Sequence, residues 1–339
     1  MAGALPDRLI TEVRDLKYST PNYNSLDNSV LFAMLAARRA VLQSGWERDD
    51  VFGINIGSSR GAADLFEKHH SHFLETGKAA LLSSPSTTLG NISSWVAQDL
   101  KSTGPDISHS ITCSTALHAV LNGVAWLRAG MANKFLVGGS EAPLTPFTIS
   151  QMQAMKIYSP LDDEFASRAM DLDKKTSTMV LGEGAAMACL EAGYNSKAMA
   201  VIEGIGYATE ILTHSVSLSG NAHCLQKSMR MALADTPLGE VDAIVMHAPG
   251  TVKGDMSEYN AIKKIFGEKP PLLTTNKWQI GHTFGASGLL SLELALLMLQ
   301  NDTFIPSPFY AQKQDRPLRK ILINAVGFGG NAVSILIAK

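Results

Sequence analysis

Apolar positions along the chain fall into two alternating patterns. Short continuous apolar runs are typical of buried strands, whereas apolar residues recurring every three or four positions are typical of helices. The predicted strands are 51–56, 134–138, 180–190, 200–207, 241–246, 272–275, 320–326 and 333–338. The predicted helices are 29–45, 92–100, 148–157, 224–234, 257–266 and 289–299, after a polar lead through residue 28. Strands alternating with helices in two similar halves predict an α/β architecture of layered sheets and helices.

The segment 110–130 joins a short apolar run to a helix that ends at Gly130. Cys113 lies at this junction, followed by leucines and valines at helical spacing. The unpaired N–H groups of a first helical turn favour thiolate over thiol, so the position is expected to lower the pKa of Cys113. Cys113 is therefore a candidate nucleophile. The alternative is a small buried apolar side chain, the commonest role of a free cysteine.

Composition and charge limit the classes of protein to which this chain can belong. The chain has 339 residues, 45% of them hydrophobic, which is enough for a large core in one or two compact domains. Its net charge of −2 gives no general attraction to nucleic acid or anionic membrane. Three unpatterned cysteines suggest neither disulfides nor a thiolate metal site, and they favour a reducing, cytoplasmic location. The apolar segment 288–300 is too short to cross a membrane, and residues 1–15 carry too many charges for a signal peptide.

The histidines fall into two groups. His69, His70 and His72 lack the spacing that puts metal ligands on one helix face, so a solvated surface is expected and no metal site is predicted. His247 follows the predicted strand 241–246, a place where α/β proteins put reactive groups. His282 lies in the glycine-rich segment NKWQIGHTFGASG.

Two further segments have ordinary structural interpretations. Asp255 and Glu258 are spaced as a capping-box-like pair at the start of the helix after His247. Met152 and Met155 are interpreted as fillers of a core or pocket.

The ordered set of motifs is more specific than any one of them. Cys113 before a helix, HAPGTVKGD at 247–255, NKWQIGHTFGASG at 276–288 and GFGG at 327–330 together resemble the β-ketoacyl-acyl carrier protein synthase family, in its branch with a Cys-His-His triad. SRAMD at 167–171 and LGEGAA at 181–186 extend the resemblance. It implies a thiolase-like fold of two duplicated βαβαβ halves in five layers (α-β-α-β-α), with halves 1–195 and 196–339.

The resemblance also implies a reaction. An acyl group would move from a carrier thioester to Cys113, and malonyl-carrier would then lose carbon dioxide and attack it. His247 and His282 would stabilise the enolate as neutral hydrogen-bond donors, a role worth about 3 kcal/mol for each donor. Lys277 would order His282. The product would be a 3-oxoacyl-carrier for fatty-acid, polyene or polyketide synthesis.

Other residues take their expected roles from the same resemblance. The N–H groups of Cys113 and Phe328 would form the oxyanion hole, and Phe328 would act as a gate whose swing Gly327 and Gly329 permit. Thr251 would contact the pantetheine arm. Met152 and Met155 would help to line the acyl pocket. No cofactor is expected beyond the phosphopantetheine of an acyl carrier protein, and the chain is expected to pair as a homodimer or in a ketosynthase-type heterodimer.

The chain departs from the family pattern at several places. The strand that usually opens these enzymes is missing before Asp27, and Pro249 replaces the first of two threonines that contact pantetheine. Ser291 occupies the position of a usual buried glutamate, with Glu293 two residues later. Residues 20–26 contain no lysine or arginine where relatives often place the basic residues that meet an acidic carrier. A dedicated carrier protein is the resulting hypothesis.

The same residues bear on three alternatives to a carrier-dependent condensing enzyme. Thiolases usually carry a second cysteine near the C-terminus, where this chain reads AVGFGGNAV, and initiating synthases usually have asparagine in place of His282. A non-catalytic partner like a chain-length factor would have lost the nucleophile, which Cys113 argues against. The missing strand keeps that last interpretation open.

Overall fold

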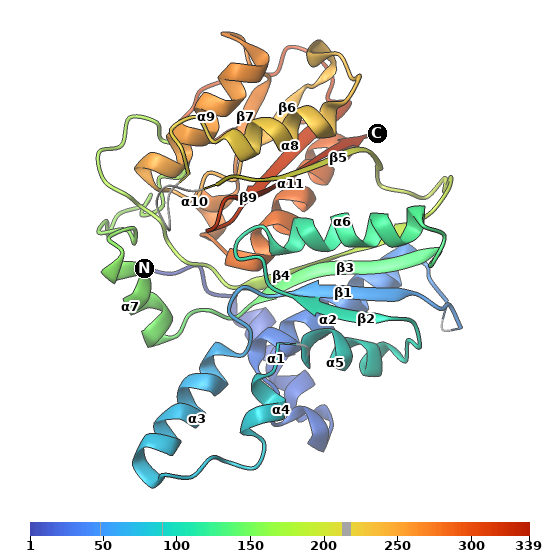
Figure 1. Ribbon diagram of the computed structural model, residues 1–339, viewed down its shortest axis with the longest axis vertical. Coiled ribbons are helices and arrows are strands. Elements are labelled where there is room, and N and C mark those ends of the chain that lie inside the picture. Colours follow the sequence, from blue (N-terminus) through green and yellow to red (C-terminus); the bar gives the residue numbers. More distant parts are fainter. Residues whose placement is uncertain (48, 90, 212–217) are drawn as a thin grey trace.

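The computed structural model describes residues 1–47, 49–89, 91–211 and 218–339, and its strands form two sheets (Figure 1). The first sheet has the order β2-β1-β3-β4 and the second β5-β9-β8-β6-β7. In the first half the elements are α1 (Asp7–Ser19), α2 (Asn28–Ser44), β1 (Gly53–Gly57), α3 (Ala63–Thr76), α4 (Ser83–Thr87), α5 (Asn91–Leu100), β2 (Asp106–His109), α6 (Thr115–Arg128), β3 (Lys134–Glu141), α7 (Pro146–Ala154) and β4 (Gly184–Glu191). In the second half they are β5 (Val201–Thr209), α8 (His223–Leu233), β6 (Ala243–Val245), α9 (Val252–Phe266), β7 (Leu272–Thr274), α10 (Lys277–Ile280), α11 (Ser287–Asn301), β8 (Lys320–Val326) and β9 (Asn331–Ala338).

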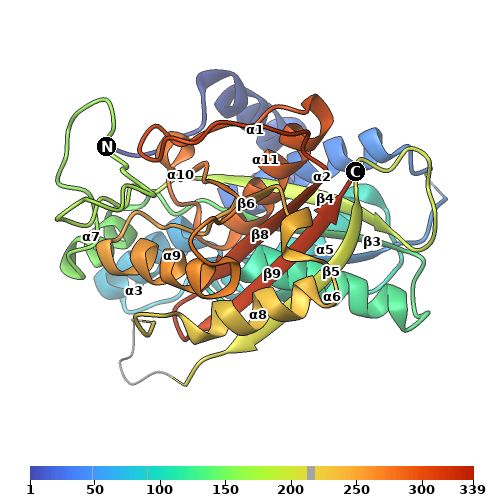
Figure 2. The ribbon, with the colours of Figure 1, turned by 90° about the horizontal axis from the view of Figure 1, so that it is seen from above.

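The elements stack in five layers, which confirms the predicted α/β arrangement. Helices α6 and α11 lie between the two sheets and share one apolar core with both of them. Helices α8 and α9 cover the outer face of the second sheet, in whose middle β8 and β9 run side by side (Figure 2). Helices α1, α2 and α5 cover the outer face of the first sheet. The central helical layer therefore carries the junction between the halves.

Close backbone contact fixes this middle layer. A side chain at Gly288, in the first turn of α11, would place its Cβ 2.7 Å from Cγ of Leu117 on α6. Glycine at this position lets the two buried helices approach each other. Phe284–Asn301 is long and apolar enough to span a membrane, but 67% of this segment is buried inside the protein, as in a core helix.

The N-terminal region, predicted only as a polar lead, contains a helix that the sequence analysis did not predict. Helix α1 forms there and buries Val13 and Leu16 against the first half, a pair whose spacing suits one face of a helix. Helix α2 begins as expected, with the side chain of Asp27 accepting from the N–H of Ser29, and ends at left-handed Gly45.

The two sheets are not equivalent. In the second sheet β5 lies antiparallel on the outer side of β9. In the first sheet β4 is the edge, and the described residues before β1 contain no strand. Instead, Gly3 forms a single bridge to Gly182 before Pro6 starts the turn into α1. The described residues before β1 thus meet the rest of the first half through one bridge and through helix packing.

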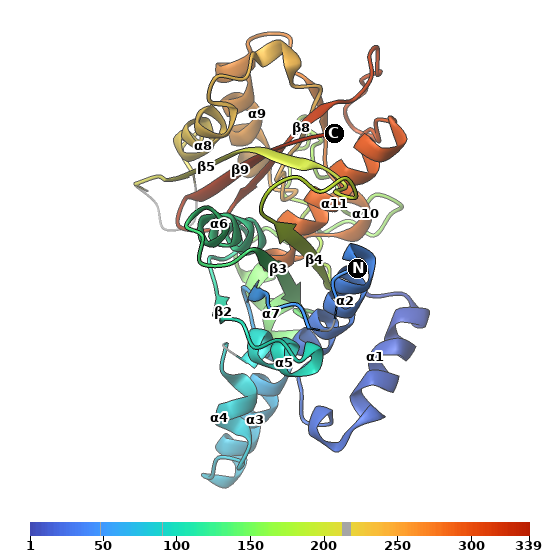
Figure 3. The same cartoon turned by 90° about the vertical axis from the view of Figure 1, so that its right-hand side faces the viewer.

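Helices α3 and α4 form an arm that projects from the body of the protein (Figure 3). No residue of α3 is buried. The arm carries exposed apolar side chains, namely Phe66, Phe73, Leu74, Leu81 and Leu82. His69, His70 and His72 lie on this arm, and no group of three metal-ligating side chains occurs among the described residues.

Candidate active site

Cys113 lies on a strained turn between β2 and α6. Thr112, directly before it, has a positive φ of 46°, which is rare for a β-branched residue. Gly327 packs against this turn so closely that a Cβ there would lie 1.9 Å from the Oγ1 of Thr112. Ser114 is the N-cap of α6, so Cys113 precedes the helix as predicted. The turn is held from both halves of the molecule.

One pocket of about 260 Å³ opens onto Cys113. Its lining comes from the turn before α6, the loops after β6 and β8, and the segment around His282. Of the residues predicted for the site, it includes Cys113, His247, His282, Thr251, Met155, Gly327, Phe328 and Gly329. Lys277 and Met152 lie behind this lining, and both are buried. Met152 belongs to an apolar cluster with Cys113, Met179, Leu181 and Phe284.

The two histidines face each other edge to face. Their ring centroids are 5.2 Å apart, with 84° between the ring planes. The backbone of His282 is fixed by the segment before β4, since its N–H donates to the carbonyl of Val180 and its carbonyl accepts from the N–H of Gly182. The Nδ1 atoms of both rings are buried without a hydrogen-bond partner in the described part of the chain, so no protein acceptor fixes their tautomers.

Burial keeps both rings neutral. It lowers the pKa of His247 and of His282 well below the usual value of 6.5. The charge of Lys277 lowers both pKa values further. Two neutral imidazoles at neutral pH are what the predicted role as hydrogen-bond donors requires.

The thiol differs from the prediction. Burial raises the pKa of Cys113 to about 12, and the nearby carboxylate of Glu141 adds to the rise. The positive charges of Lys277 and Arg60 act in the opposite direction without overcoming it. The expectation that this position would lower the pKa of Cys113 is therefore wrong, because desolvation outweighs the nearby positive charges and the backbone hydrogen bond that lower it. Cys113 rests as a thiol.

Lys277 carries a buried amine at the start of α10. Burial lowers its pKa to about 8, against the opposing charges of Glu258, Cys113 and Asp255. Lys277 forms no ion pair with any described residue. Ser291, which replaces the family's usual glutamate, is buried, and its Oγ has no partner in the part of the chain that the structure describes. Ser291 therefore puts a neutral hydroxyl in the buried position where the family usually has a carboxylate.

The carboxylates of Asp255 and Glu258, in the first two turns of α9, are structural, but they do not form a capping box. Thr251 is the N-cap of α9, and its side chain accepts from the N–H of Gly254. Asp255 accepts instead from the N–H groups of Gly250 and Met170 and pairs with buried Lys174 at 2.6 Å. The capping-box interpretation is wrong because both carboxylates point back into the loop rather than toward the helix N-terminus.

Glu258 orients His247. Its two oxygens accept from the N–H groups of His247 and Ala248 at 2.9 and 2.8 Å, and Asn324 on β8 donates to it as well. Burial raises the pKa of Glu258 to about 6, despite these donors. The carboxylate therefore fixes the backbone that delivers the imidazole to the pocket.

Glu141, at the end of β3, is a second buried carboxylate that the sequence analysis missed. Its Oε1 accepts from the N–H groups of Ser59 and Gly285, which join the turn after β1 to the segment after His282. Its Oε2 has no partner among the described residues, and burial raises its pKa to about 7. The available signal was an acidic residue directly after a buried strand, in GGSEAP.

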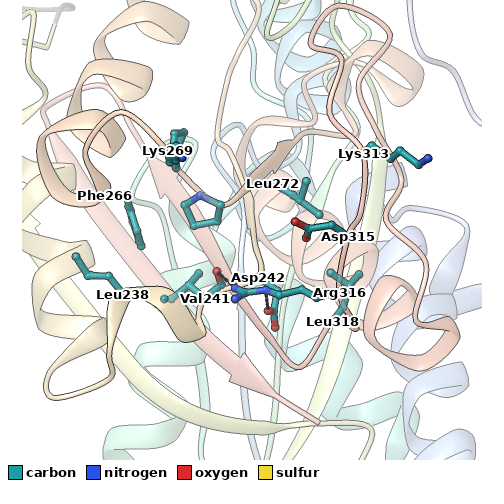
Figure 4. A pocket seen from close by; sticks show the side chains of 13 residues that line it. Leu238, Val241, Asp242, Phe266, Lys269, Leu272, Lys313, Asp315, Arg316 and Leu318 are labelled. Atoms are coloured by element: carbon teal, nitrogen blue, oxygen red, sulfur yellow. Dashed lines mark hydrogen bonds and ion pairs between the residues drawn. The ribbon is translucent and has the colours of Figure 1, made fainter.

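A larger hollow of about 420 Å³ lies elsewhere, near the starts of β6 and β7 (Figure 4). It contains no cysteine or histidine. Its Asp242 is fully used by an ion pair with Arg316 and by the N–H groups of Arg319 and Lys320. This hollow offers no nucleophile, so the chemistry is assigned to the pocket at Cys113.

Two family models match consecutive parts of the chain. The N-terminal domain of β-ketoacyl synthase matches residues 15–195, and the C-terminal domain matches residues 199–310. The chain belongs to the β-ketoacyl synthase family. It is accordingly a condensing enzyme, an acyltransferase that forms carbon–carbon bonds.

Individual relatives agree with this assignment. The 3-oxoacyl-[acyl-carrier-protein] synthase 2 of Vibrio harveyi is 29% identical over 375 aligned positions that cover 100% of this chain and 87% of that protein. The ishigamide ketosynthase/chain length factor superposes with a TM-score of 0.86 at 22% identity, covering 100% of this chain and 87% of its own. A type II PKS acyl-carrier protein in complex with its ketosynthase gives a TM-score of 0.82 at 22% identity, covering 91% and 84%. These structures confirm the thiolase-like fold of the β-ketoacyl synthases.

The raised thiol pKa predicts the reactivity of Cys113 with iodoacetamide. Only the thiolate reacts, so the alkylation rate should rise about tenfold for each pH unit from 7 to 9 without levelling off. Peptide mass spectrometry would resolve Cys113 from Cys189 and Cys224, with Cys113→Ala as the control. A plateau below pH 9 would show instead that the helix N-terminus controls the thiol.

The influence of Lys277 on the histidines can be measured by NMR. The resonances of His247 and His282, assigned with His→Asn variants, should not titrate between pH 8 and 6. In Lys277→Met the charge that disfavours imidazolium is lost, so the pKa of both rings should rise. Lys277→Arg keeps the charge and serves as the matched control. Unchanged values in Lys277→Met would exclude this electrostatic role.

Proposed function

We propose that the chain is a 3-oxoacyl-[acyl-carrier-protein] synthase of fatty-acid or specialised polyene or polyketide biosynthesis. The observation that carries the proposal is the convergence of Cys113, His247 and His282 on one pocket from both halves of the fold. Its substrates are an acyl-carrier and a malonyl-carrier thioester. The phosphopantetheine arm belongs to the carrier, and the enzyme uses no metal.

Acylation comes first. The sulfur of Cys113 attacks the carbonyl of the acyl-carrier thioester, a new carbon–sulfur bond forms, and the bond to the carrier sulfur breaks. Because the resting group is a thiol, its proton must leave during the attack. One of the two neutral imidazoles, of His247 or His282, accepts that proton and returns it to the departing carrier thiolate.

Decarboxylation of malonyl-carrier follows. The bond to the carboxylate breaks, carbon dioxide leaves, and the electron pair moves into an enolate. His247 and His282 donate hydrogen bonds to the enolate oxygen in a site with little water, where such donors are most effective. Lys277 keeps both rings neutral and so preserves their basic form for proton transfer and their single N–H for donation.

Carbon–carbon bond formation completes the cycle. The enolate carbon attacks the acyl-cysteine carbonyl, whose oxyanion is held by the N–H groups of Cys113 and Phe328. Collapse expels the Cys113 thiolate, which takes up one proton from solvent because its own proton left with the first carrier thiol. Phe328 is partly exposed at the pocket, and Gly329 beside it has a φ of 93°, so the loop suits the predicted gate. Thr251 contacts the pantetheine arm of the carrier, and Met152 and Met155 help to line the pocket for the acyl group.

The alternative is a non-catalytic subunit that shapes the tunnel of a ketosynthase, like a chain-length factor. One of the similar structures is a ketosynthase paired with such a factor. The complete set of Cys113 and both histidines supports the catalytic role. A cytoplasmic location and a dedicated carrier protein stay predictions.

Intact-mass analysis tests the proposal. Incubation with acyl-carrier thioesters should add the acyl mass to the protein, and Cys113→Ala should gain none. Addition of malonyl-carrier should remove the acyl group and release a 3-oxoacyl-carrier. No mass gain with short, long or aromatic acyl groups would favour the non-catalytic subunit.

We also propose that the α3–α4 arm is the surface through which the chain pairs, as a homodimer or with a ketosynthase-type partner. Its apolar side chains are exposed on a helix with no buried residue, and Phe147 on α7 is exposed as well. Exposed apolar side chains gathered on one arm suit a surface for protein association.

Charge placed on the arm should prevent pairing. We expect the wild-type chain to sediment as a dimer and Leu74→Asp/Leu81→Asp to sediment as a monomer. Leu42 on α2 is 83% exposed, so Leu42→Asp provides a matched control that should remain dimeric. Dimers that persist in the double variant would place the interface elsewhere.

A further inference from the structure

Arg60 is a cation beside the nucleophile that the mechanism does not use. It lies in the turn after β1 and is half-buried. Its guanidinium carbon is 5.1 Å from the ring centroid of Phe284, and its Nη1 donates to Oε1 of Gln151 at 2.7 Å. It forms no ion pair with any described residue. The guanidinium is therefore held in place without a neutralising carboxylate.

A second arginine that packs on an aromatic ring differs from Arg60 in having a carboxylate partner. Arg168 packs over the ring of Phe309 at 5.0 Å, an arrangement like that of Arg60 over Phe284. Unlike Arg60, it also pairs with a carboxylate, that of Asp171, at 2.7 Å. A guanidinium has five N–H donors that match a carboxylate in a two-bond fork. At Arg60 one donor goes to Gln151, and no carboxylate of the described chain takes the rest.

Arg60 does not line the pocket at Cys113, but it packs against a residue that does. The ring of Phe284 lines the pocket together with Cys113 and carries the guanidinium. Gln151 directly precedes Met152, which is buried in the apolar cluster with Cys113 and Phe284. The charge of Arg60 is also close enough to act on the thiol. An acyl group on Cys113 that packs against Phe284 therefore ends near an unpaired cation.

We propose that Arg60 is a specificity-determining residue that selects a short acyl group ending in a carboxylate. This inference rests on the proposed function and names its acyl substrate class. Phe284 and Gln151 hold the guanidinium plane before the substrate arrives, so a terminal carboxylate can accept two hydrogen bonds from it. An aliphatic end of the same shape leaves those donors without a partner in a poorly hydrated site, which disfavours it.

Two acyl groups of the same shape test the proposal. Succinyl-carrier and 4-methylpentanoyl-carrier differ only in whether the branched end is a carboxylate or two methyl groups. Acylation of Cys113 by each is followed by intact mass at equal concentration. In the wild-type protein the rate with succinyl should exceed the rate with 4-methylpentanoyl at least tenfold.

Three variants separate specificity from general effects. Arg60→Met should lower the ratio of the two rates at least tenfold, and Arg60→Lys should retain part of the preference because it keeps the charge without the fork. Gln151→Glu should lower the ratio as well, since the new carboxylate would neutralise Arg60 in place. A guanidinium that acted only on the thiol pKa, or only by packing on Phe284, would change both rates equally and leave the ratio unaltered.

The results separate failure of the role of Arg60 from failure of the proposed function. A wild-type preference for 4-methylpentanoyl, or a ratio that neither Arg60→Met nor Gln151→Glu changes, overturns the inference while the condensing function stands. If Arg60→Met fails to fold by thermal melting, Gln151→Glu decides. If no carrier thioester of any acyl group modifies Cys113, the proposed function itself fails, and the role of Arg60 fails with it.

Discussion

Exclusion of water from the junction between the two halves is the constraint on which the site depends. Cys113, His247, His282 and Lys277 are each no more than 5% exposed. Burial is the largest cause of the pKa shift of each group. It raises the pKa of the Cys113 thiol and lowers the pKa of both imidazoles and of the Lys277 amine. Of these four side chains, only Lys277 is therefore charged at rest. Charge develops only during reaction, where fixed donors in a low-dielectric site stabilise it most.

Two buried carboxylates build this junction through the backbone. Glu258 fixes the loop that carries His247, and Glu141 joins the turn after β1 to the segment after His282. A buried carboxylate is costly unless it accepts hydrogen bonds, so each carboxylate requires the loops around it to supply N–H groups. Loops from different sheets are thereby brought to one place. The geometry of the site rests on these main-chain contacts rather than on ion pairs between its side chains.

Local pattern predicted the elements better than it predicted their chemistry. The strands at 134–138 and 320–326, and the helix between Cys113 and Gly130, follow from apolar spacing and a glycine stop. The thiol pKa does not, because the local helix dipole is overcome by burial, which depends on residues distant in the sequence. Asp255 and Glu258 have the spacing of a cap, and only the folded loop shows that they accept from residues before the helix. Helix α1 was missed because its apolar face is narrow and its other residues are polar.

The shortened first sheet is compatible with an intact site because of where the strand is missing. The absent position neighbours β4, whereas Cys113 follows β2 at the opposite edge of the sheet. The segment before β4 nonetheless needs support, since it fixes the backbone of His282 on one side. On its other side Gly3 donates to the carbonyl of Leu181 and accepts from the N–H of Glu183. Two hydrogen bonds from one bridging residue thus hold this segment on the side opposite His282.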